Sequence, residues 1–321
     1  MKYSLVTGGA GFIGSHLCKR LIDENFFVIC IDNLITGSEL NIAALNNNEN
    51  FVFINYDVIN PLNDILLKFK KIDYIFHLAS PASPNKKSKK SYMNYPIETL
   101  LVNSYGTYNL LEIAKITDSR FLYASTSEIY GDPKVSPQSE SYFGNVNPVG
   151  PRAVYDEGKR FGEAITMVYV RKFDIDGRIA RIFNTYGENM QEDDGRVVSN
   201  FIIQALRNEP ISIFGDGSQT RSFCYVSDLV DGLYNFMMRD GLEGEVINLG
   251  NPKEYTINAI ADIIRKLTHS SSKIVHADLP EDDPKQRKPN IEKSKNLLDF
   301  SPKVEIEEGF EKTIEYFKKI I

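Results

Sequence analysis

The stretch that decides the fold is TGGAGFIG, residues 7–14, in which Gly8, Gly11 and Gly14 recur at intervals of three. An apolar run precedes it and predicts a buried strand, and an amphipathic pattern at 12–24 predicts a helix directly after it. Glycine permits the tight turn and lets the backbone approach a pyrophosphate, while the helix N-terminus offers unpaired N–H groups. Because glycine turns also serve only to pack a helix on a strand, the surrounding sequence has to decide between the two.

The same alternation of apolar runs and amphipathic stretches continues to about residue 184. We expect buried strands at 3–7, 27–32, 51–55, 73–79, 120–125 and 176–183, with helices at 12–24, 94–117 and 153–172 between them. This order predicts an α/β fold with a Rossmann-type, doubly wound parallel sheet. We expect residues 1–184 to form the dinucleotide-binding domain. Residues 185–321, with a helix near 197–208, should mostly form a smaller α/β substrate-binding lobe that is interleaved with it.

A carboxylate follows each of the next two predicted strands. Asp32 ends the second strand, where it could accept both ribose hydroxyls of a dinucleotide and would repel a 2′-phosphate, so we expect NAD rather than NADP. Asp57 ends the third strand and either contacts the adenine or caps a turn. The cofactor should also contact Phe12, Ile13, Asn33, Thr36, Gly37, Val58, Leu78, Ala79, Ser80, Asn103 and Ser125.

The segment YDEGK places Tyr155 and Lys159 four residues apart, on one face of a predicted helix. A lysine ammonium beside a tyrosine favours the phenolate, which could take a proton from a substrate hydroxyl while hydride passes to the cofactor. Such a pair is common on helix surfaces, but the glycine turn and the sequence STSE after the fifth strand favour catalysis. Thr126 would share a hydrogen bond with the phenolic oxygen or with the substrate hydroxyl, and capping of the strand-to-loop turn is compatible with that role.

The composition of the chain indicates which partners, which bound groups and which cellular compartment to expect. The chain has 321 residues, a net charge of −6 and an isoelectric point near 5.4, which argues against a nucleic-acid or anionic-membrane partner. Its three cysteines, Cys18, Cys30 and Cys224, are widely spaced, and its four histidines are scattered, so we expect no disulfide framework and no metal site. With no signal peptide and no apolar run long enough to span a bilayer, we expect a cytoplasmic protein.

In combination, these motifs resemble the extended short-chain dehydrogenases/reductases that act on nucleotide sugars, and within them the UDP-glucuronate decarboxylases. The likeness covers the whole length. The segments that carry it are HLASPASP, STSEIYGDP, VNPVGPRAVYDEGKR, ARIFNTYG, DDGRVVSNFI, GDGSQTRSFCYVSDLV, NLGNP and DDPKQRKPNI. The resemblance implies conversion of UDP-glucuronate to UDP-xylose, with oxidation at C4, loss of CO2 and return of the hydride.

Ser127 favours this branch of the superfamily. The sugar 4,6-dehydratases that the chain resembles carry Asp-Glu where it has Ser127-Glu128, because their acid protonates a departing 6-hydroxyl. Glucuronate has a carboxylate at C6 and nothing there to protonate. Oxidation at C4 makes a β-keto acid, from which CO2 leaves unaided. A neutral serine suffices, and a second ionised carboxylate would repel that of the substrate.

The resemblance also implies roles for individual residues. Tyr155 would be the base and later the acid at O4, tuned by Lys159, while Thr126 and Ser127 would orient the sugar. Glu128 and Arg287 would manage the carboxylate and the C5 proton, in a division that the sequence leaves open. Substrate contacts are expected from Ser83, Asn184, Arg196, Val198, Phe214, Gln219, Arg221 and Arg287. The helices 94–117 and 153–172 would pair across a two-fold axis into a four-helix bundle, giving a homodimer.

Three positions depart from the family pattern. The lysine-rich segment Lys86–Lys90 is an insertion, which we expect to be a solvated loop, and Leu101 and Asn63 replace a lysine and an aromatic residue that are common in the family. These changes leave open another uronic acid or another base. A 4-epimerase or 4,6-dehydratase with the same tyrosine, lysine and NAD is the nearest alternative, and a non-enzymatic NAD-sensing scaffold is a more distant one.

Overall fold

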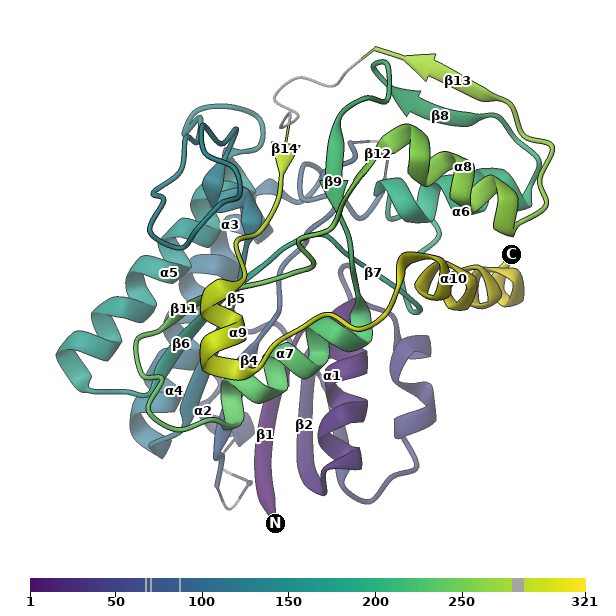
Figure 1. The fold of residues 1–321 in the computed structure, drawn as a ribbon. Coiled ribbons are helices and arrows are strands. Elements are labelled where there is room, and N and C mark those ends of the chain that lie inside the picture. The colour runs from purple at the N-terminus through teal and green to yellow at the C-terminus, as the bar shows by residue number, and fades with distance from the viewer. Residues whose placement is uncertain (67, 70, 87, 279–285) are drawn as a thin grey trace.

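The computed structural model of the chain describes residues 1–66, 68–69, 71–86, 88–278 and 286–321. Its centre is a seven-stranded sheet in the order β11-β6-β5-β4-β1-β2-β3, and every neighbouring pair is parallel (Figure 1). The strands are β1 (Lys2–Thr7), β2 (Phe26–Asp32), β3 (Phe51–Asn55), β4 (Tyr74–His77), β5 (Arg120–Thr126), β6 (Gly177–Ile182) and β11 (Val246–Leu249). This confirms the predicted fold class. The order reverses between β1 and β4, so a crevice for ligands is expected at the carboxyl ends of these strands.

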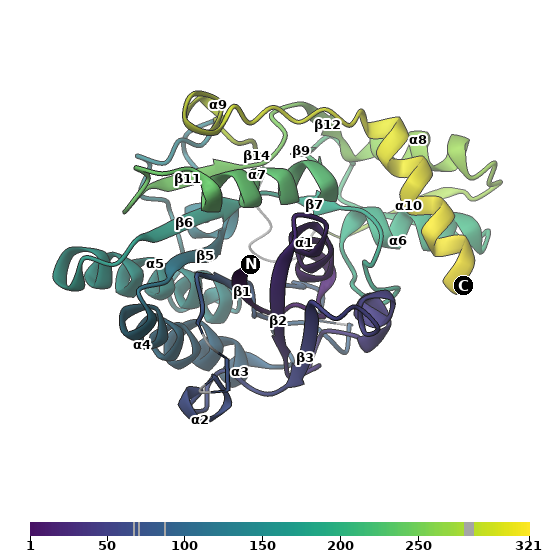
Figure 2. The ribbon, with the colours of Figure 1, turned by 90° about the horizontal axis from the view of Figure 1, so that it is seen from below.

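Helices cover both faces of the sheet (Figure 2). On one face lie α1 (Phe12–Asp23) and α7 (Val226–Met238); on the other lie α2 (Asn63–Leu66), α3 (Pro96–Leu101), α4 (Thr107–Thr117) and α5 (Ala153–Phe173). In β5, Phe121 packs into the core under α4 and α5, while Leu122 packs into the core under α1 and α7. Because each strand serves two cores, its sequence is an unbroken apolar run rather than an alternation of apolar and polar residues.

The helix predicted at 94–117 is interrupted. It consists of α3 and α4 joined by a π-helical turn, η2 (Val102–Gly106). Asn103 in this turn is fully buried, donates a hydrogen bond to Ser80 Oγ and accepts one from the Tyr123 hydroxyl. The extra residue of a π turn re-aims the side chains that follow it, which a simple periodicity does not predict.

The rest of the chain mostly forms a group of smaller elements above the carboxyl ends of the sheet (Figure 1). They include α6 (Val197–Leu206), α8 (Ile257–Leu267), α10 (Ile306–Ile320) and the strands β8 (Ile211–Phe214), β9 (Thr220–Ser222), β12 (Glu254–Thr256), β13 (Ile274–Ala277) and β14 (Gln286–Arg287). Two short helices, η1 (Glu39–Leu45) and η3 (Ser127–Tyr130), belong to the first part of the chain. The short elements of the second part are β7 (Thr185–Tyr186), β10 (Cys224–Tyr225) and α9 (Glu292–Leu298). Two elements of the second part of the chain, α7 and β11, return to the large sheet. Across the described ranges, no helix has both the length and the apolar character needed to cross a membrane.

Candidate active site

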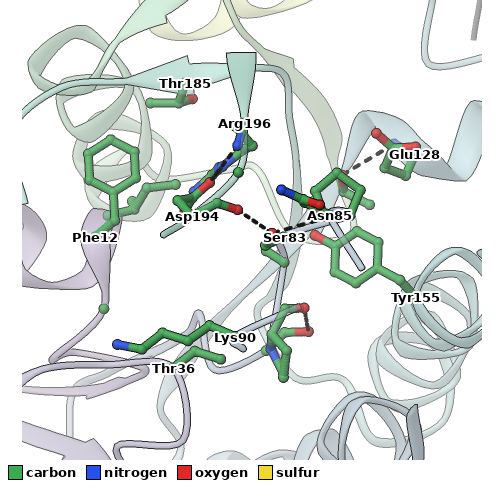
Figure 3. A pocket seen from close by; sticks show the side chains of 18 of the residues that line it. Phe12, Thr36, Ser83, Asn85, Lys90, Glu128, Tyr155, Thr185, Asp194 and Arg196 are labelled. Atoms are coloured by element: carbon green, nitrogen blue, oxygen red, sulfur yellow. Dashed lines mark hydrogen bonds and ion pairs between the residues drawn. The ribbon is translucent and has the colours of Figure 1, made fainter. Parts of the chain in front are cut away.

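A cavity of about 940 Å³ lies at the carboxyl ends of the sheet strands, between the sheet and the smaller elements. Its walls come from the glycine turn after β1, the end of β5, the first turns of α5 and the segment that leads into α6. In Figure 3, Tyr155 and Glu128 lie on one side of this cavity, and Phe12 and Thr36 lie on the other. A cavity of this size accommodates a large ligand or two smaller ones.

The glycine turn forms a cradle that only glycine permits. Gly8 has a φ of +71°, and a Cβ atom there would lie 2.7 Å from the backbone nitrogen of Ala79. A Cβ atom on Gly14 would lie 2.1 Å from the carbonyl oxygen of Gly8. Helix α1 begins at this point without a side-chain cap on its N-terminus, so its first N–H groups suit a pyrophosphate. The residues present therefore fit a dinucleotide.

Polar side chains at the ends of β2 and β3 continue this cradle. The buried carboxylate of Asp32 accepts hydrogen bonds from the backbone N–H groups of Ala10 and Leu34, at 3.0 and 2.8 Å. Burial raises the pKa of Asp32, and these two bonds act against the rise. The amide of Asn33 donates to Asp57 at 2.9 Å, which joins two residues predicted to contact the cofactor.

Tyr155 and Lys159 point from the first turns of α5 toward the end of β5, where both line the cavity. Burial lowers the pKa of Lys159 to about 7, although the charge of Glu163 opposes it. Burial also raises the pKa of Tyr155, and a hydrogen bond with Thr126 works to lower it. Desolvation is the largest influence on both groups, so burial works against the phenolate that Lys159 is expected to favour.

Thr126 both caps a turn and contacts the phenol of Tyr155. Its hydroxyl accepts a hydrogen bond from the backbone N–H of Glu128 at 3.2 Å, which caps η3, and it also reaches the phenol of Tyr155. The end of β5 and the helix α5 are thus connected through one side chain.

Glu128 lies between two arginines. Its Oε1 atom is 2.6 Å from a guanidinium nitrogen of Arg287, and its Oε2 atom is 2.6 Å from one of Arg152. Burial works to raise the pKa of Glu128, but the two positive charges outweigh it and hold the pKa at about 2. Arg287 is 2% exposed and also donates to Ser127 Oγ at 3.3 Å and to the carbonyl oxygen of Gly131 at 3.0 Å. The side chains predicted to handle a carboxylate are therefore together.

Three further residues complete this part of the site, and the sequence interpretation did not single them out. They are Arg152, Asp156 and Tyr92, whose buried ring lies against that of Tyr155. Burial raises the pKa of Asp156 to about 7, with the charge of Glu128 adding to the rise and Arg152 opposing it. Arg152 and Asp156 belong to PRAVYDEGK, so their proximity to Tyr155 in the sequence was a usable signal. Tyr92 gave no such signal.

The opposite wall comes from the segment before α6. Arg196 forms a two-point ion pair with Asp194, at 2.5 and 2.7 Å, and its guanidinium lies 5.8 Å from the centre of the Phe12 ring. Figure 3 shows Asp194 accepting a hydrogen bond from the Ser83 hydroxyl through its backbone oxygen. A second bridge runs from Gln191 to the carbonyl oxygen of Thr36. These contacts connect the two sides of the cavity.

Most of the residues predicted for the site line this one cavity. Gly8, Gly11, Phe12, Ile13, Gly14, Asp32, Asn33, Thr36, Asp57, Val58, Leu78, Ala79, Ser80, Ser83, Ser125, Thr126, Ser127, Glu128, Tyr155, Lys159, Asn184, Arg196, Val198, Phe214, Arg221 and Arg287 all do so. Gly37, Asn103 and Gln219 are not part of the lining. Gly37 packs against the carboxylate of Asp32, Asn103 lies behind Ser80, and Gln219 donates to the carbonyl oxygen of Phe214.

The lysine-rich insertion is closer to the cavity than expected. Lys86 and Lys90 line it, and Lys90 is half-buried and lies beside Thr36 (Figure 3). The segment folds back because Ser91 donates to the carbonyl oxygen of Ser83 and Tyr92 does so through its N–H. Lys87 lies outside the described residues, as do residues 282–285 of the DDPKQRKPNI motif. Within the described ranges, no group of three His, Cys, Asp or Glu residues is arranged to hold a metal ion.

A family model, curated relatives and solved structures all match this chain over most of its length. Residues 4–250 match the model of the NAD dependent epimerase/dehydratase family. UDP-glucuronic acid decarboxylase 1 of Danio rerio is 49% identical over 318 residues, which cover 99% of this chain and 73% of that protein. UDP-glucuronic acid decarboxylase 6 of Arabidopsis thaliana is 49% identical over 306 residues, which cover 95% and 85%. The structure of a UDP-glucuronic acid 4-epimerase from Bacillus cereus, in complex with UDP-glucuronic acid and NAD, aligns with a TM-score of 0.87 at 33% identity, covering 99% of this chain and 100% of that one.

Proposed function

The chain belongs to the NAD dependent epimerase/dehydratase family, and from this premise we propose that it is an NAD-dependent decarboxylase that converts UDP-glucuronate to UDP-xylose. The observation that carries the proposal is the arrangement at the end of β5. There, neutral Ser127 and the doubly ion-paired Glu128 stand beside Arg287, in reach of Tyr155. The 47–49% identity to UDP-glucuronic acid decarboxylases over nearly the whole chain supports the same conclusion.

NAD would be held by the cradle described above. The Gly8–Gly14 turn would receive the pyrophosphate, Asp32 the adenosine ribose, and Lys159 the ribose nearer the reaction centre. When bound, NAD supplies a hydride acceptor for the C4 hydrogen of the sugar and later a hydride donor to the same carbon. The cycle is redox-neutral overall.

Tyr155 would exchange the proton of the C4 hydroxyl. Burial raises the pKa of this phenol, so the phenolate needs support. Thr126 supplies a hydrogen bond, and Lys159 supplies a positive charge whenever it is protonated, which the lowered pKa of about 7 makes variable near neutral pH. The lysine is therefore suited to hold or release a proton as the state of Tyr155 changes.

Loss of CO2 would follow without an acid catalyst. Once C4 is a carbonyl, the electron pair of the C5–C6 bond moves into it, CO2 departs, and an enolate remains whose C5 needs one proton. Because Glu128 is an anion held by Arg287 and Arg152, it suits the task of orienting these cations and a water molecule better than that of donating a proton itself. We assign the C5 proton to such a water, and the hydroxide that it leaves takes a proton from solvent, so the overall reaction consumes one proton for each CO2 released.

The nucleotide would bind on the opposite wall. The cavity is lined there by Arg196, Arg221 and Asn184. Their side chains offer hydrogen-bond donors, and the arginines also offer positive charge, which together bind a diphosphate strongly. In this arrangement residues 1–184 form the NAD-binding domain and residues 185–321 mostly the nucleotide-sugar lobe, with α7 and β11 returning to the large sheet.

We further propose a homodimer. The outer faces of α3, η2, α4 and α5 expose large apolar side chains, which on a second copy would be covered in a four-helix bundle. These side chains are Ile97, Leu100, Tyr105, Tyr108, Ile116, Phe161 and Val168. All three cysteines are buried thiols, which suits a reducing compartment, and we propose the cytoplasm.

The test of the function is direct. Purified protein is incubated with UDP-glucuronate, and the products are followed by NMR, with Tyr155→Phe as the inactive control. We expect a UDP-pentose and CO2. The similarity to solved 4-epimerases at 30–33% identity supports a second candidate, and an epimerised uronate or a stable 4-keto-6-deoxy sugar would establish that candidate instead.

A further inference from the structure

We infer that Lys90, at the end of the lysine-rich insertion Lys86–Lys90, is a further cofactor-binding residue, whose ammonium group pairs with the diphosphate of NAD in addition to the glycine turn. The inference goes beyond the proposed decarboxylation and does not depend on which sugar is the substrate. It needs only the NAD that members of this family use. It gives a role to a segment that departs from the family pattern.

The first support is that the segment around Lys90 is fixed in place. Its two ends meet where Ser91 donates to the carbonyl oxygen of Ser83 at 2.9 Å and forms a short parallel bridge with it. Inside the loop, Ser88 is 3% exposed. Its hydroxyl accepts from the N–H of Lys90 at 3.1 Å, and its carbonyl oxygen accepts from the amide of Asn94 at 2.7 Å. The backbone of Lys90 is therefore held independently of its own side chain.

The second support is where this segment is attached. At one end, the hydroxyl of Ser83 donates to the backbone oxygen of Asp194, which lines the cavity. At the other end, the ring of Tyr92 stacks on that of Tyr155 at 4.9 Å between ring centroids. Both attachment points belong to the candidate active site, so the insertion is built into the wall of the cavity.

The third support is the position of the ammonium group. Lys90 lines the cavity and is half-buried, and Figure 3 shows its side chain extended alongside Thr36, toward the side on which Phe12 lies. Among the described residues, none forms an ion pair or a hydrogen bond with this ammonium group. A cation that faces a partly enclosed cavity without a carboxylate of its own is suited to bind an anionic ligand there.

The part of the cavity around Thr36 is next to the expected position of the cofactor diphosphate. Thr36 belongs to the loop after β2, and the carboxylate of Asp32 at the start of this loop accepts from the N–H of Ala10 in the glycine turn at 3.0 Å. The loop and the turn therefore lie against each other. The turn leads into the N-terminus of α1, which has no side-chain cap and suits a pyrophosphate.

A diphosphate at this place needs more positive charge than the turn supplies. A helix N-terminus contributes only about half a positive charge, and the carboxylate of Asp32 is close by. The guanidinium of Arg196 lies 5.8 Å from the centre of the Phe12 ring, but it forms a two-point ion pair with Asp194. Lys90 would contribute a full positive charge on this side of the cavity.

This contact has a consequence for the proposed reaction cycle. The cofactor has to stay bound between the removal of hydride from C4 and its return to the same carbon. The oxidised and reduced cofactors have the same diphosphate, so Lys90 would retain both of them. We therefore expect Lys90 to act on the affinity for the cofactor and not on the chemistry at C4.

The test measures ligand binding to the full-length protein after its NAD has been removed. Lys90→Gln and Lys90→Arg are compared with Lys89→Gln, which changes the adjacent lysine, an exposed residue that is not part of the cavity lining. Calorimetry gives the Kd values of NAD and of UDP at low and at high NaCl concentration. For Lys90→Gln at low salt we expect NAD to bind about tenfold more weakly and UDP to stay within about twofold of wild type.

The remaining comparisons show whether the charge is responsible. High salt should weaken NAD binding to wild type more than to Lys90→Gln, because salt screens the charge that the variant has lost. Lys90→Arg should keep most of the affinity for NAD, and Lys89→Gln should match wild type. If the protein unfolds without NAD, the exchange of labelled NAD into the purified holoprotein decides, and it should be about tenfold faster in Lys90→Gln.

The inference is overturned if Lys90→Gln binds or exchanges NAD as wild type does, because the insertion would then be a solvated loop. It is also overturned if UDP weakens as much as NAD or more, or if the salt dependence of NAD binding is unchanged in the variant. A protein whose affinity for NAD depends on Lys90 but which forms no pentose from UDP-glucuronate would refute the proposed decarboxylation alone.

Discussion

The Nζ atom of Lys159 lies 2.8 Å from the carbonyl oxygen of Ala124, so a buried cation from α5 is attached to β5 two residues before Thr126. Its side chain is 3% exposed, which is why burial lowers its pKa to about 7 from an ordinary value of 10.5. The unfolded chain binds this proton more tightly than the folded one. Between about pH 7 and 10.5, the lysine therefore makes the free energy of unfolding increase with pH.

Replacing this lysine tests both its charge and its role. At pH 6 we expect the free energy of unfolding of Lys159→Met to exceed that of wild type by about 1 kcal/mol or more, so that the variant unfolds at a higher urea concentration. This difference in free energy should shrink toward pH 9. The value of kcat should fall about 100-fold or more. Urea titrations at three pH values check this, with Lys172→Met, at the exposed end of α5, as the control. Parallel pH dependences for wild type and Lys159→Met would contradict the burial of the charge.

Glu128 should govern stability in acid. Its pKa of about 2 lies below the ordinary 4.5, so its contribution is present above pH 4.5 and is lost as the pH falls toward 2. Glu128→Gln removes the carboxylate that pairs with Arg287 and Arg152, and it should reduce the free energy of unfolding at pH 7 by about 3 kcal/mol. Glu157→Gln, in an exposed pair with Arg160, should change it by less than about 0.5 kcal/mol. Equal losses in the two variants would show that the cluster is not stabilising.

Substitutions of Ser127 test whether the reaction proceeds without an acid catalyst at this position. Ser127→Ala keeps the position neutral and should retain kcat within about tenfold, because no leaving group needs a proton there. Ser127→Asp places a second anion beside Glu128, competes for Arg287 and should lower kcat/KM for UDP-glucuronate about 100-fold or more. Chromatographic assay of UDP-xylose formation separates the two. An aspartate variant as active as the alanine variant would remove the chemical basis for the serine.

Gly14 tests the cofactor cradle. Gly14→Ala forces a methyl group to within 2.1 Å of the carbonyl oxygen of Gly8, so the turn must open and NAD affinity should fall about 100-fold or more. The measurement is the Kd for NAD together with the NAD content of the purified protein. Gly241→Ala is the control for the added methyl group, because a Cβ atom there has no other atom within 4 Å, and its strain at a φ of +72° stays in a turn away from the cradle. NAD retention in Gly14→Ala would mean that the pyrophosphate binds elsewhere.

The proposed dimer is tested on its exposed apolar face. Tyr105 and Phe161 are 62% and 48% exposed on η2 and α5, and changing both to glutamate should give a monomer in analytical ultracentrifugation. Leu40, which is 85% exposed on η1, provides the matched control as Leu40→Glu and should leave the mass unchanged. A wild-type protein that sediments only as a monomer would end this proposal.

Six strands of the large sheet, β1 to β6, could be predicted because each depends on local sequence, whereas β11 was not among the predicted strands. The glycine turn, the apolar runs that became β1–β6 and the periodicity of α1 and α5 all carry their signal within a few residues. The π turn at Val102–Gly106 was missed, because it depends on Asn103 being held by Ser80 and Tyr123, which are distant in the chain.

For the site, the identity of the side chains could be predicted better than their electrostatic state. The grouping of Glu128 with Arg287 followed from family motifs, but the second ion pair with Arg152 and the raised pKa of Tyr155 depend on burial in the folded molecule. Tyr92 lies on Tyr155 with ring centroids 4.9 Å apart and planes 7° from parallel. No spacing of residues in the sequence predicts this contact between two rings.

The late position of Arg287 has a consequence for biosynthesis. Its partner Ser127 precedes it by 160 positions, and the strands that support Ser127 and Glu128 are already translated long before the arginine is added. At about 5–20 residues per second, a nascent chain would carry Ser127 and Glu128 without Arg287 for roughly 10 to 30 seconds. An interrupted translation product that ends before this arginine would contain the glycine turn of the proposed NAD site, yet it would lack the arginine proposed to act on the sugar carboxylate.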